Sequence, residues 1–202
     1  MKCDKQNMLL YAVTDRAWVG KQTLYEQVES ALKGGVTCVQ LREKELDDEA
    51  FSERGCGDSC SVPALRRAVL CERQCGHCHP LPRRGCACGA GGYGCSAGAR
   101  PCGRGNDDRL SVHSVEEARE AVKHGADCLG VGAAFATHTK TDVDVLPHET
   151  LKAICDAVDI PVVAIGGIHK ENILQLKGTG VDGVALVSAI LQQTTSRPSA
   201  KS

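Results

Sequence analysis

Short apolar runs alternate with segments of helical periodicity along most of the chain, and this alternation constrains the fold more than any other feature of the sequence. Before residue 52, predicted strands at 9–13 and 36–41 enclose a predicted helix at 22–33. The same order resumes after residue 109, with strands expected at 110–112, 128–135, 161–165 and 181–187 and helices at 114–125, 147–158 and 170–177. Strands that alternate with helices of about ten residues form parallel βαβ units, so the sequence predicts an α/β fold around a parallel sheet.

The segment 52–104 interrupts this order and differs in composition from both flanks. It contains nine of the chain's 13 cysteines and eight arginines, but no Lys, Ile, Phe or Met. GC-rich codons that are read out of register produce such a composition, and we therefore hypothesise that this segment is frameshifted. Its length is what two βα units would occupy, so two strands of an eight-stranded barrel are expected to be absent from it.

A genuine metal-binding module is the alternative interpretation of the cysteine-rich segment. Cys71, Cys75 and Cys78 have the spacing of the iron–sulfur motif of radical S-adenosylmethionine enzymes. Cys86 and Cys88 could join Cys75, Cys78 and His79 in a zinc site, although no second well-spaced pair completes it. Three cysteines of the flanks lie on apolar faces and are predicted to be small core residues, namely Cys38, Cys128 and Cys155.

Charge and composition exclude several classes of partner. A net charge of -1 and a pI near 6.6 provide no basic surface for nucleic acid and no polybasic anchor for a membrane. The apolar run 8–13 is too short for the hydrophobic region of a signal peptide or for a membrane span. We therefore expect a cytoplasmic protein that acts on small molecules. The chain is expected to form one domain, 1–202, with an irregular tail at 191–202.

Polar side chains gather where the predicted strands end, which is where barrel enzymes place their sites. Gln40, Arg42 and Lys44 alternate along one strand and so share a face, and this arrangement suits a diphosphate. The segment 132–140 supplies hydroxyls and an ammonium group, which are common phosphate ligands. The glycine pair 166–167 ends a further strand, where glycine lets backbone amides approach an anion. A solvated strand end and ordinary loop chemistry are the alternative interpretations of the first two patterns.

Six short strings carry a resemblance to a known family. They are Tyr11 to Asp15, Gln40 to Lys44, Ser111 to Ser114, Thr137 to Lys140, Ile165 to Ile168 and Val187 to Ile190. In this order they resemble the thiamine phosphate synthases, and the resemblance covers residues 9–51 and 105–190. It implies a TIM (β/α)8 barrel, here with the third and fourth strands expected to be missing or disordered.

The resemblance also implies the two substrates, a pyrimidine diphosphate and a thiazole phosphate. The residues that it assigns to the pyrimidine diphosphate are Gln40, Leu41, Arg42, Glu43, Lys44, Ser111 and Lys140. The residues that it assigns to the thiazole phosphate are Thr137, His138, Thr139, Gly167, Val187 and Ser188. Arg42, Lys44 and Lys140 are expected to be catalytic, because they would stabilise the charge on the departing diphosphate.

A barrel that binds thiazole phosphate without joining the two rings, similar to thiazole tautomerase, is the alternative function. Thr137, Thr139 and Lys140 favour the synthase. Magnesium is the cofactor that the resemblance implies, and the family holds it through two aspartates, one in an Asn-Asp pair and one shortly before a Gly-Gln pair. Neither motif occurs in 52–104, where Asp58 is the only aspartate, and we therefore assign no metal ligand.

Overall fold

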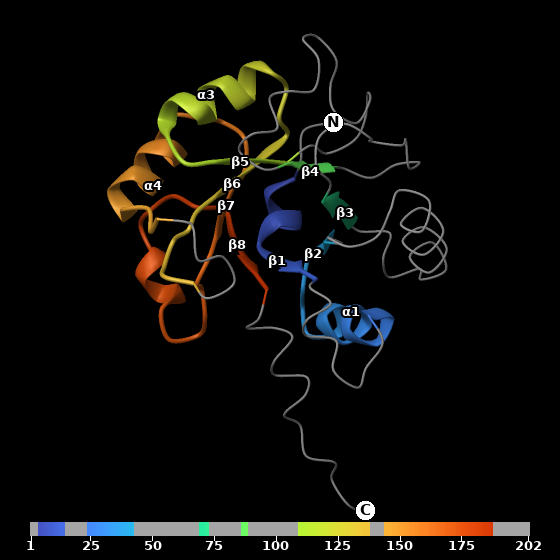
Figure 1. The fold of residues 1–202 in the computed structure, drawn as a ribbon. Helices are drawn as coiled ribbons and strands as arrows, with labels where there is room; N and C mark the ends of the chain where they lie inside the picture. The colour runs from blue at the N-terminus through green and yellow to red at the C-terminus, as the bar shows by residue number, and fades with distance from the viewer. Residues whose placement is uncertain are drawn as a thin grey trace, which may run out of the picture.

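The computed structural model describes residues 4–14, 24–42, 69–72, 86–88, 109–137 and 144–187 (Figure 1). For residues 24–25, 41–42, 69–72 and 86–88 it describes the backbone and not the side chains. Most of the segment 52–104 and all of the tail 191–202 lie outside the described residues. The expectation of an irregular tail falls on those parts of the chain, and so do Cys75, Cys78 and His79 of the metal-module hypothesis, whereas its Cys71, Cys86 and Cys88 lie in segments described by their backbone alone. None of the helices described is long and apolar enough to cross a membrane.

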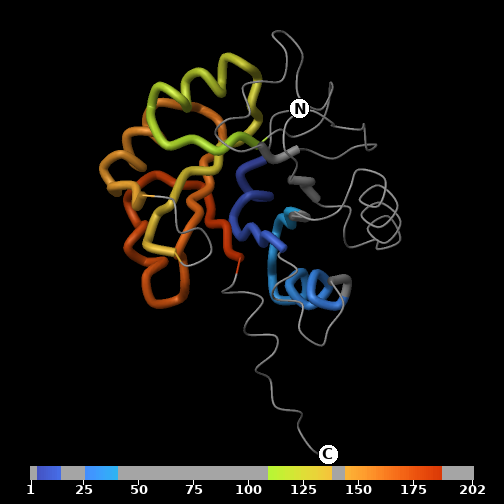
Figure 2. Tube along the Cα trace, viewed as in Figure 1, coloured from blue at the N-terminus to red at the C-terminus, as the bar shows by residue number. Residues whose placement is uncertain are grey.

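The described strands form one closed barrel, and every neighbouring pair is parallel. In chain order they are β1 (Leu10–Val13), β2 (Cys38–Arg42), β3 (Val69–Glu72), β4 (Cys86–Cys88), β5 (Arg109–Val112), β6 (Cys128–Val131), β7 (Val162–Ile165) and β8 (Gly183–Leu186). β1 pairs with β2 on one side and with β8 on the other, so the first and last strands lie side by side (Figure 2). Because the strands are all parallel, their carboxyl ends meet at one end of the barrel, where barrel enzymes place their sites.

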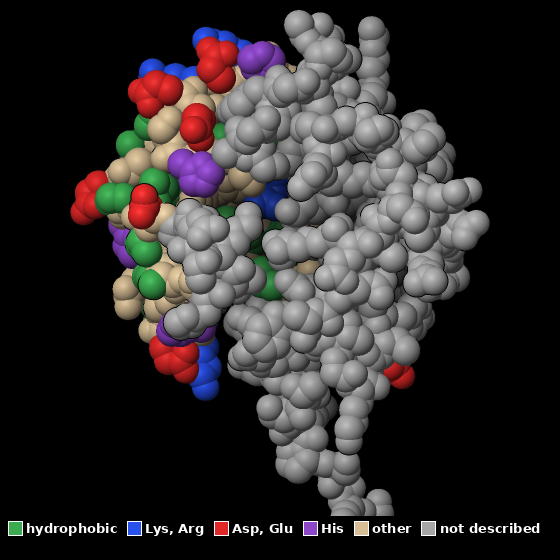
Figure 3. Space-filling view, in the orientation of Figure 1, with side chains coloured by type: hydrophobic (Ala, Val, Ile, Leu, Met, Phe, Trp, Pro, Cys, Tyr) green, Lys and Arg blue, Asp and Glu red, His purple; other side chains and the backbone are tan. Residues whose placement is uncertain are grey.

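The described α-helices lie outside this barrel, whereas the 3-10 turn at the N-terminus lies across its centre in Figure 1 and contributes Met8 to its interior. The described helices are the 3-10 helices η1 (Lys5–Met8) and η5 (Ile173–Leu176) and the α-helices α1 (Leu24–Lys33), α3 (Val115–Lys123) and α4 (His148–Asp156). Charged side chains of both signs lie on the outer surface over α3 and α4 (Figure 3), where Lys123 pairs with Glu120 and Lys152 with Asp156. Each helix is therefore amphipathic, with its charged face in water and its apolar face toward the sheet.

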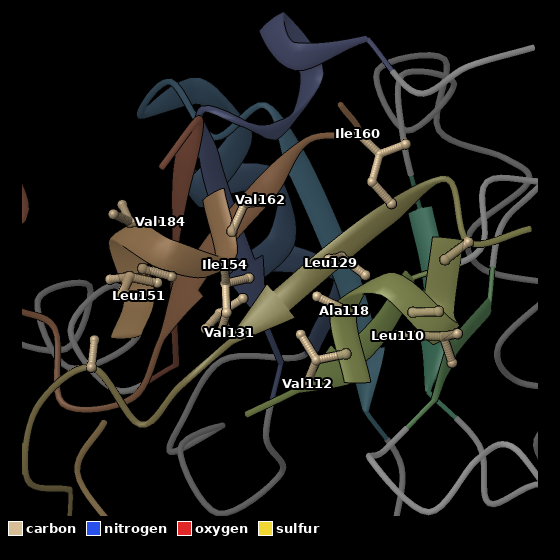
Figure 4. Close-up of a cluster of buried hydrophobic side chains, with 14 of the residues drawn as sticks. Leu110, Val112, Ala118, Leu129, Val131, Leu151, Ile154, Ile160, Val162 and Val184 are labelled. Carbon is tan, nitrogen blue, oxygen red and sulfur yellow. The ribbon is translucent and has the colours of Figure 1, made fainter. Parts of the chain in front are cut away.

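Apolar side chains fill a space on each face of the sheet. Outside the barrel, Leu129 and Val162 of the strands pack with Leu151 and Ile154 of α4 (Figure 4). Inside the barrel lies a second buried cluster, which contains Met8, Tyr11, Val13, Cys38, Cys128, Val163 and Ala185. Successive residues of a strand point to opposite faces, which is why Cys128 belongs to the inner cluster and Leu129 to the outer one.

The flank cysteines behave as the sequence predicts. Cys38 and Cys128 are fully buried inside the barrel, which confirms that they are small core residues. Cys155 is half-buried and packs against the outer cluster. All three are free thiols.

The expectation that the third and fourth strands would be missing is wrong. β3 and β4 lie within 52–104, where β3 pairs with β2 and β4, and β4 pairs with β5. Parallel pairing uses backbone N–H and C=O groups that every residue except proline carries, so it tolerates an unusual set of side chains. Without β3 and β4, the facing edges of β2 and β5 would carry unpaired backbone groups, which is costly.

Two predicted elements differ from those observed in length or type. The strand expected at 128–135 ends at Val131, and beyond it Ala134 N donates to the oxygen of Ile165, the last residue of β7, and Phe135 N to that of Gly166 in the following turn. The helix expected at 170–177 is a single 3-10 turn, η5, which ends where Lys177 takes an extended conformation, with φ -61° and ψ 128°.

Candidate active site

Gln40 lies on the inner face of β2 and is 2% exposed. The Tyr11 hydroxyl donates a hydrogen bond to Gln40 Oε1 at 2.7 Å, and Arg109 Nη1 donates to the same oxygen at 2.6 Å. The three side chains come from β1, β2 and β5, so it is closure of the barrel that brings them together. We call Tyr11, Gln40 and Arg109 the Gln40 cluster.

Arg109 is a residue of this cluster that the sequence analysis missed. It is the first residue of β5, it is 4% exposed, and its guanidinium carbon lies 5.2 Å from the centroid of the Tyr11 ring. A cation at that distance over an aromatic face is attracted by the ring quadrupole. The alternation of Arg109 with Ser111 along the strand was the available signal, because alternate residues share a face.

Gly130 provides the space that Arg109 occupies. A Cβ atom at this position would lie 2.5 Å from Arg109 Nε, closer than real contacts allow, so any larger residue would displace the guanidinium. Gly130 is also the register partner of Ser111 across β5 and β6. The predicted substrate-binding residue Ser111 is half-buried on the same face of β5 as Arg109.

Burial sets the protonation state of Tyr11. It raises the pKa of the Tyr11 phenol well above the ordinary value of 10.0, and the Arg109 guanidinium opposes this shift in part. The direction of the shift keeps the hydroxyl protonated at neutral pH. Tyr11 is therefore a hydrogen-bond donor to Gln40, which agrees with the short contact between them.

The turn after β7 contains Gly166 and Gly167, with φ angles of 98° and 63°. A Cβ at Gly167 would lie 2.6 Å from the Phe135 carbonyl oxygen, so both the backbone conformation and the space require glycine there. Asn172 holds the turn from the other side, since its Nδ2 donates to the Gly167 oxygen at 2.8 Å and its Oδ1 accepts from His169 N at 2.8 Å. Asn172 is 8% exposed, and the sequence analysis did not select it.

The loop after β6 reaches the same turn. Ala134 N donates to the Ile165 oxygen at 2.9 Å, and Phe135 N donates to the Gly166 oxygen at 3.0 Å. Thr137, a predicted thiazole-phosphate residue, is half-buried two positions further along this loop. The structure therefore brings the loop that carries Thr137 against the turn that contains Gly167.

Val187 follows β8, the strand next to β7. It is half-buried and packs against the cluster inside the barrel. Of the predicted site residues, Leu41 and Arg42 belong to β2, where the structure describes only the backbone. The others lie outside the described residues and are Glu43, Lys44, His138, Thr139, Lys140 and Ser188.

The described residues do not fit a magnesium site. Among them, no group of three or more His, Cys, Asp and Glu side chains lies close enough together to hold a metal ion. Magnesium is bound through carboxylate oxygens, often together with substrate phosphates. Within the described part of the chain, the polar groups in and at the mouth of the barrel are instead an amide, a guanidinium, hydroxyls and backbone groups.

A closed parallel barrel with polar groups and a glycine turn at the carboxyl ends of its strands defines the class of (β/α)8-barrel proteins. The model of the family described as "Thiamine monophosphate synthase" matches residues 10–57 and 109–190. The chain belongs to this family. The matched residues stop and resume close to the limits of the anomalous segment 52–104.

Individual relatives agree with this assignment. The chain is 40% identical to a thiamine-phosphate synthase of Ruminiclostridium cellulolyticum, over 98% of this chain and 94% of that protein. It is 38% identical to one of Clostridium acetobutylicum, over 90% of this chain and 86% of that protein. The solved structure of thiamine phosphate pyrophosphorylase from Pyrococcus furiosus superposes with a TM-score of 0.71 and 30% identity, covering 93% of this chain and 89% of that one.

Proposed function

We propose that the chain is a thiamine-phosphate synthase, a transferase of thiamine biosynthesis. Relatives that are similar over most of the length of the chain are named thiamine-phosphate synthases, which favours the synthase over a tautomerase-like barrel. The observation that carries the proposal at the site is the pair of hydrogen bonds from Ala134 and Phe135 to the turn after β7. These bonds gather Thr137 and Gly167 at one edge of the barrel, next to the strand that Val187 follows.

The reaction joins two small molecules. The bond between the pyrimidine methylene carbon and the diphosphate oxygen breaks, and its electron pair leaves with the diphosphate. The thiazole nitrogen then donates its lone pair to the methylene carbon, and the products are thiamine phosphate and diphosphate. The protein has little proton transfer to perform, so its contribution is the alignment of the two rings and the stabilisation of the departing charge.

The side chains divide between these two tasks. In the proposal, Arg42, Lys44 and Lys140 are the cations that stabilise the leaving diphosphate. The pyrimidine is held by Gln40, Leu41, Glu43 and Ser111. The thiazole phosphate is held by Thr137, His138, Thr139, Gly167, Val187 and Ser188, where the glycine turn offers backbone amides to the anion.

Formation of thiamine phosphate from the two substrates tests the proposal. We expect the purified chain to release one diphosphate per thiamine phosphate, and Lys140→Ala to lower kcat by about 100-fold, as loss of one charge-stabilising group does in other enzymes. Lys152→Ala is the matched control, because Lys152 is exposed on α4 and pairs with Asp156. Binding of thiazole phosphate without any joining of the rings would replace the proposal by the tautomerase-like function.

A further inference from the structure

The Gln40 side chain has two ends that differ in chemistry. Its amide oxygen only accepts hydrogen bonds, and its amide nitrogen only donates them. In the structure the oxygen accepts from both Tyr11 and Arg109, at 2.7 Å and 2.6 Å. The nitrogen is therefore on the opposite side of the amide from these two donors.

Rotation of the amide by half a turn is opposed by Arg109. A guanidinium has five N–H donors and no acceptor, so Arg109 can bind only the oxygen end of Gln40. The Tyr11 hydroxyl stays protonated because burial raises its pKa, but a phenol can donate or accept, so it tolerates either end of the amide. A rotated amide would place N–H groups against the Arg109 donors, in a part of the barrel where Gln40 and Arg109 are nearly inaccessible to water. Unmade hydrogen bonds of buried polar groups are costly.

Arg109 is itself fixed in place. Gly130 leaves the space for its guanidinium, and the Tyr11 ring lies below its charge at 5.2 Å. Burying a cation costs free energy unless it has partners, so a guanidinium held on an acceptor and over an aromatic face has little freedom to move. Tyr11 and Arg109 together therefore act on Gln40 from two strands.

We propose that Arg109, held over the Tyr11 ring, is a positioning residue, which keeps the Gln40 amide in the one orientation that presents its N–H donors to the pyrimidine substrate. The inference rests on the proposed function, in which Gln40 contacts the pyrimidine. A pyrimidine ring nitrogen has a lone pair and no hydrogen, so a donor recognises it and an amide oxygen does not. Neither Arg109 nor Tyr11 needs to touch the substrate for this role.

Calorimetric dissociation constants for the pyrimidine diphosphate and for thiazole phosphate test this role. We expect Arg109→Met to weaken binding of the pyrimidine diphosphate about 5- to 10-fold, the effect of about one lost hydrogen bond. Tyr11→Phe, which keeps the ring under Arg109, should weaken it less. Thiazole phosphate should bind as it does to the unmodified chain, since its residues lie on other loops. Arg119→Met is the matched control, because Arg119 is exposed on α3. Equal weakening of both ligands would overturn the inference and indicate a general loss of structure.

A double-mutant comparison separates positioning from direct attraction of the diphosphate by the Arg109 charge. If Arg109 acts through Gln40, Arg109→Met should add no further loss in a Gln40→Ala background, because coupled residues are non-additive. The same loss in both backgrounds would overturn the inference. Should Arg109→Met fail to fold, Gln40→Glu still tests whether the donor end of Gln40 faces the substrate.

Gln40→Glu provides a second and opposite test. A carboxylate accepts from both Tyr11 and Arg109, so this variant should fold at least as stably as the unmodified chain while the pyrimidine diphosphate binds at least 10-fold more weakly. Unchanged binding would contradict the role of Gln40 as a donor. If the unmodified chain bound no pyrimidine diphosphate, the proposed function would be wrong, and this inference with it. If the unmodified chain bound it and the Arg109 and Gln40 variants bound it equally well, only this inference would be wrong.

Discussion

At the scale of single residues, Asn172 decides the geometry of the glycine turn at the barrel edge. Its side chain makes hydrogen bonds at 2.8 Å to the Gly167 oxygen and to His169 N, and it is 8% exposed. We predict that Asn172→Ala lowers the free energy of unfolding by about 1–3 kcal/mol, the usual cost of leaving buried partners unpaired. The variant should also bind thiazole phosphate more weakly, because the Gly167 carbonyl, and with it the glycine turn, is no longer held in place. Urea denaturation and calorimetry measure the two effects.

Asn172→Asp is the matched variant for this prediction. The carboxylate can still accept from His169 N but cannot donate to the Gly167 oxygen. It should therefore recover part of the stability while thiazole phosphate binding stays weak. Recovery of full binding by Asn172→Asp would show that the bond to Gly167 does not position the turn.

Cys155 should make the free energy of unfolding depend on pH in the alkaline range. Burial raises the pKa of its thiol from 9.0 to about 11, and the carboxylates of Asp182 and Asp156 add to the shift. The unfolded chain therefore loses this proton at a lower pH than the folded chain, so stability should fall as the pH rises from about 9 to about 11. We predict a smaller fall for Cys155→Ala, measured by urea denaturation across that range.

The range from pH 6 to pH 8 is the internal control, because the thiol is protonated there in both states. The difference in free energy of unfolding between the unmodified chain and Cys155→Ala should be constant throughout this range. An unchanged slope above pH 9 in Cys155→Ala would contradict the prediction. At neutral pH the raised pKa also keeps Cys155 in its poorly nucleophilic thiol form.

Sequence reasoning selected candidate site residues whose type is conspicuous at a strand end, and it missed residues whose role depends on their position in the fold. Gln40 lies in a row of polar residues at a strand end, which is a visible pattern. Arg109 precedes a short apolar run, and only the closed barrel shows that its guanidinium reaches across from β5 to Gln40 in β2. Asn172 likewise acts on a turn five residues earlier in the chain. Such contacts depend on the fold in three dimensions, and residue spacing alone does not specify them.

At the scale of secondary structure, the beginning of α3 shows how local chemistry fixes an element. Ser114 Oγ accepts from Glu117 N at 3.1 Å, and Glu117 Oε2 accepts from His113 N at 2.7 Å. We predict that Ser114→Ala lowers the free energy of unfolding by about 1 kcal/mol, the typical value of an N-cap. Ser114→Asp should retain the stability, because aspartate caps equally well. Equal stability of all three proteins would mean that packing alone holds α3.

Local signals of this kind explain which elements the sequence predicted well. The helix expected at 114–125 is observed as α3, Val115–Lys123, because its cap lies in the sequence. The strand expected at 128–135 is too long by four residues, since Ala134 and Phe135 bond to the end of β7 and to the turn after it rather than continuing the ladder of β6. That competition is non-local, and an apolar run does not reveal it.

At the scale of the whole molecule, closure of the barrel depends on β3 and β4. These strands contain four and three residues, and they join β2 to β5 through backbone pairing. The Gln40 cluster requires this closure, because Arg109 of β5 reaches Gln40 of β2 only if the strands between them bring the two together. Composition failed to predict β3 and β4, because backbone groups make the pairing and almost any side chain permits it.

The last prediction concerns the coding sequence of residues 52–104, which we propose is read out of frame. Resequencing across codons 50 to 112 should show a shifted frame that encodes an Asn-Asp pair and then an aspartate before Gly-Gln. A protein made from that frame should unfold at a higher urea concentration than the present chain, because side chains selected for a barrel would then pack on β3 and β4. The inner cluster and the flanks are identical in the two proteins, so the difference measures the segment alone. If the present frame is correct and the purified protein contains about one equivalent of iron or zinc, the cysteine-rich segment is a metal-binding module and the frameshift hypothesis is wrong.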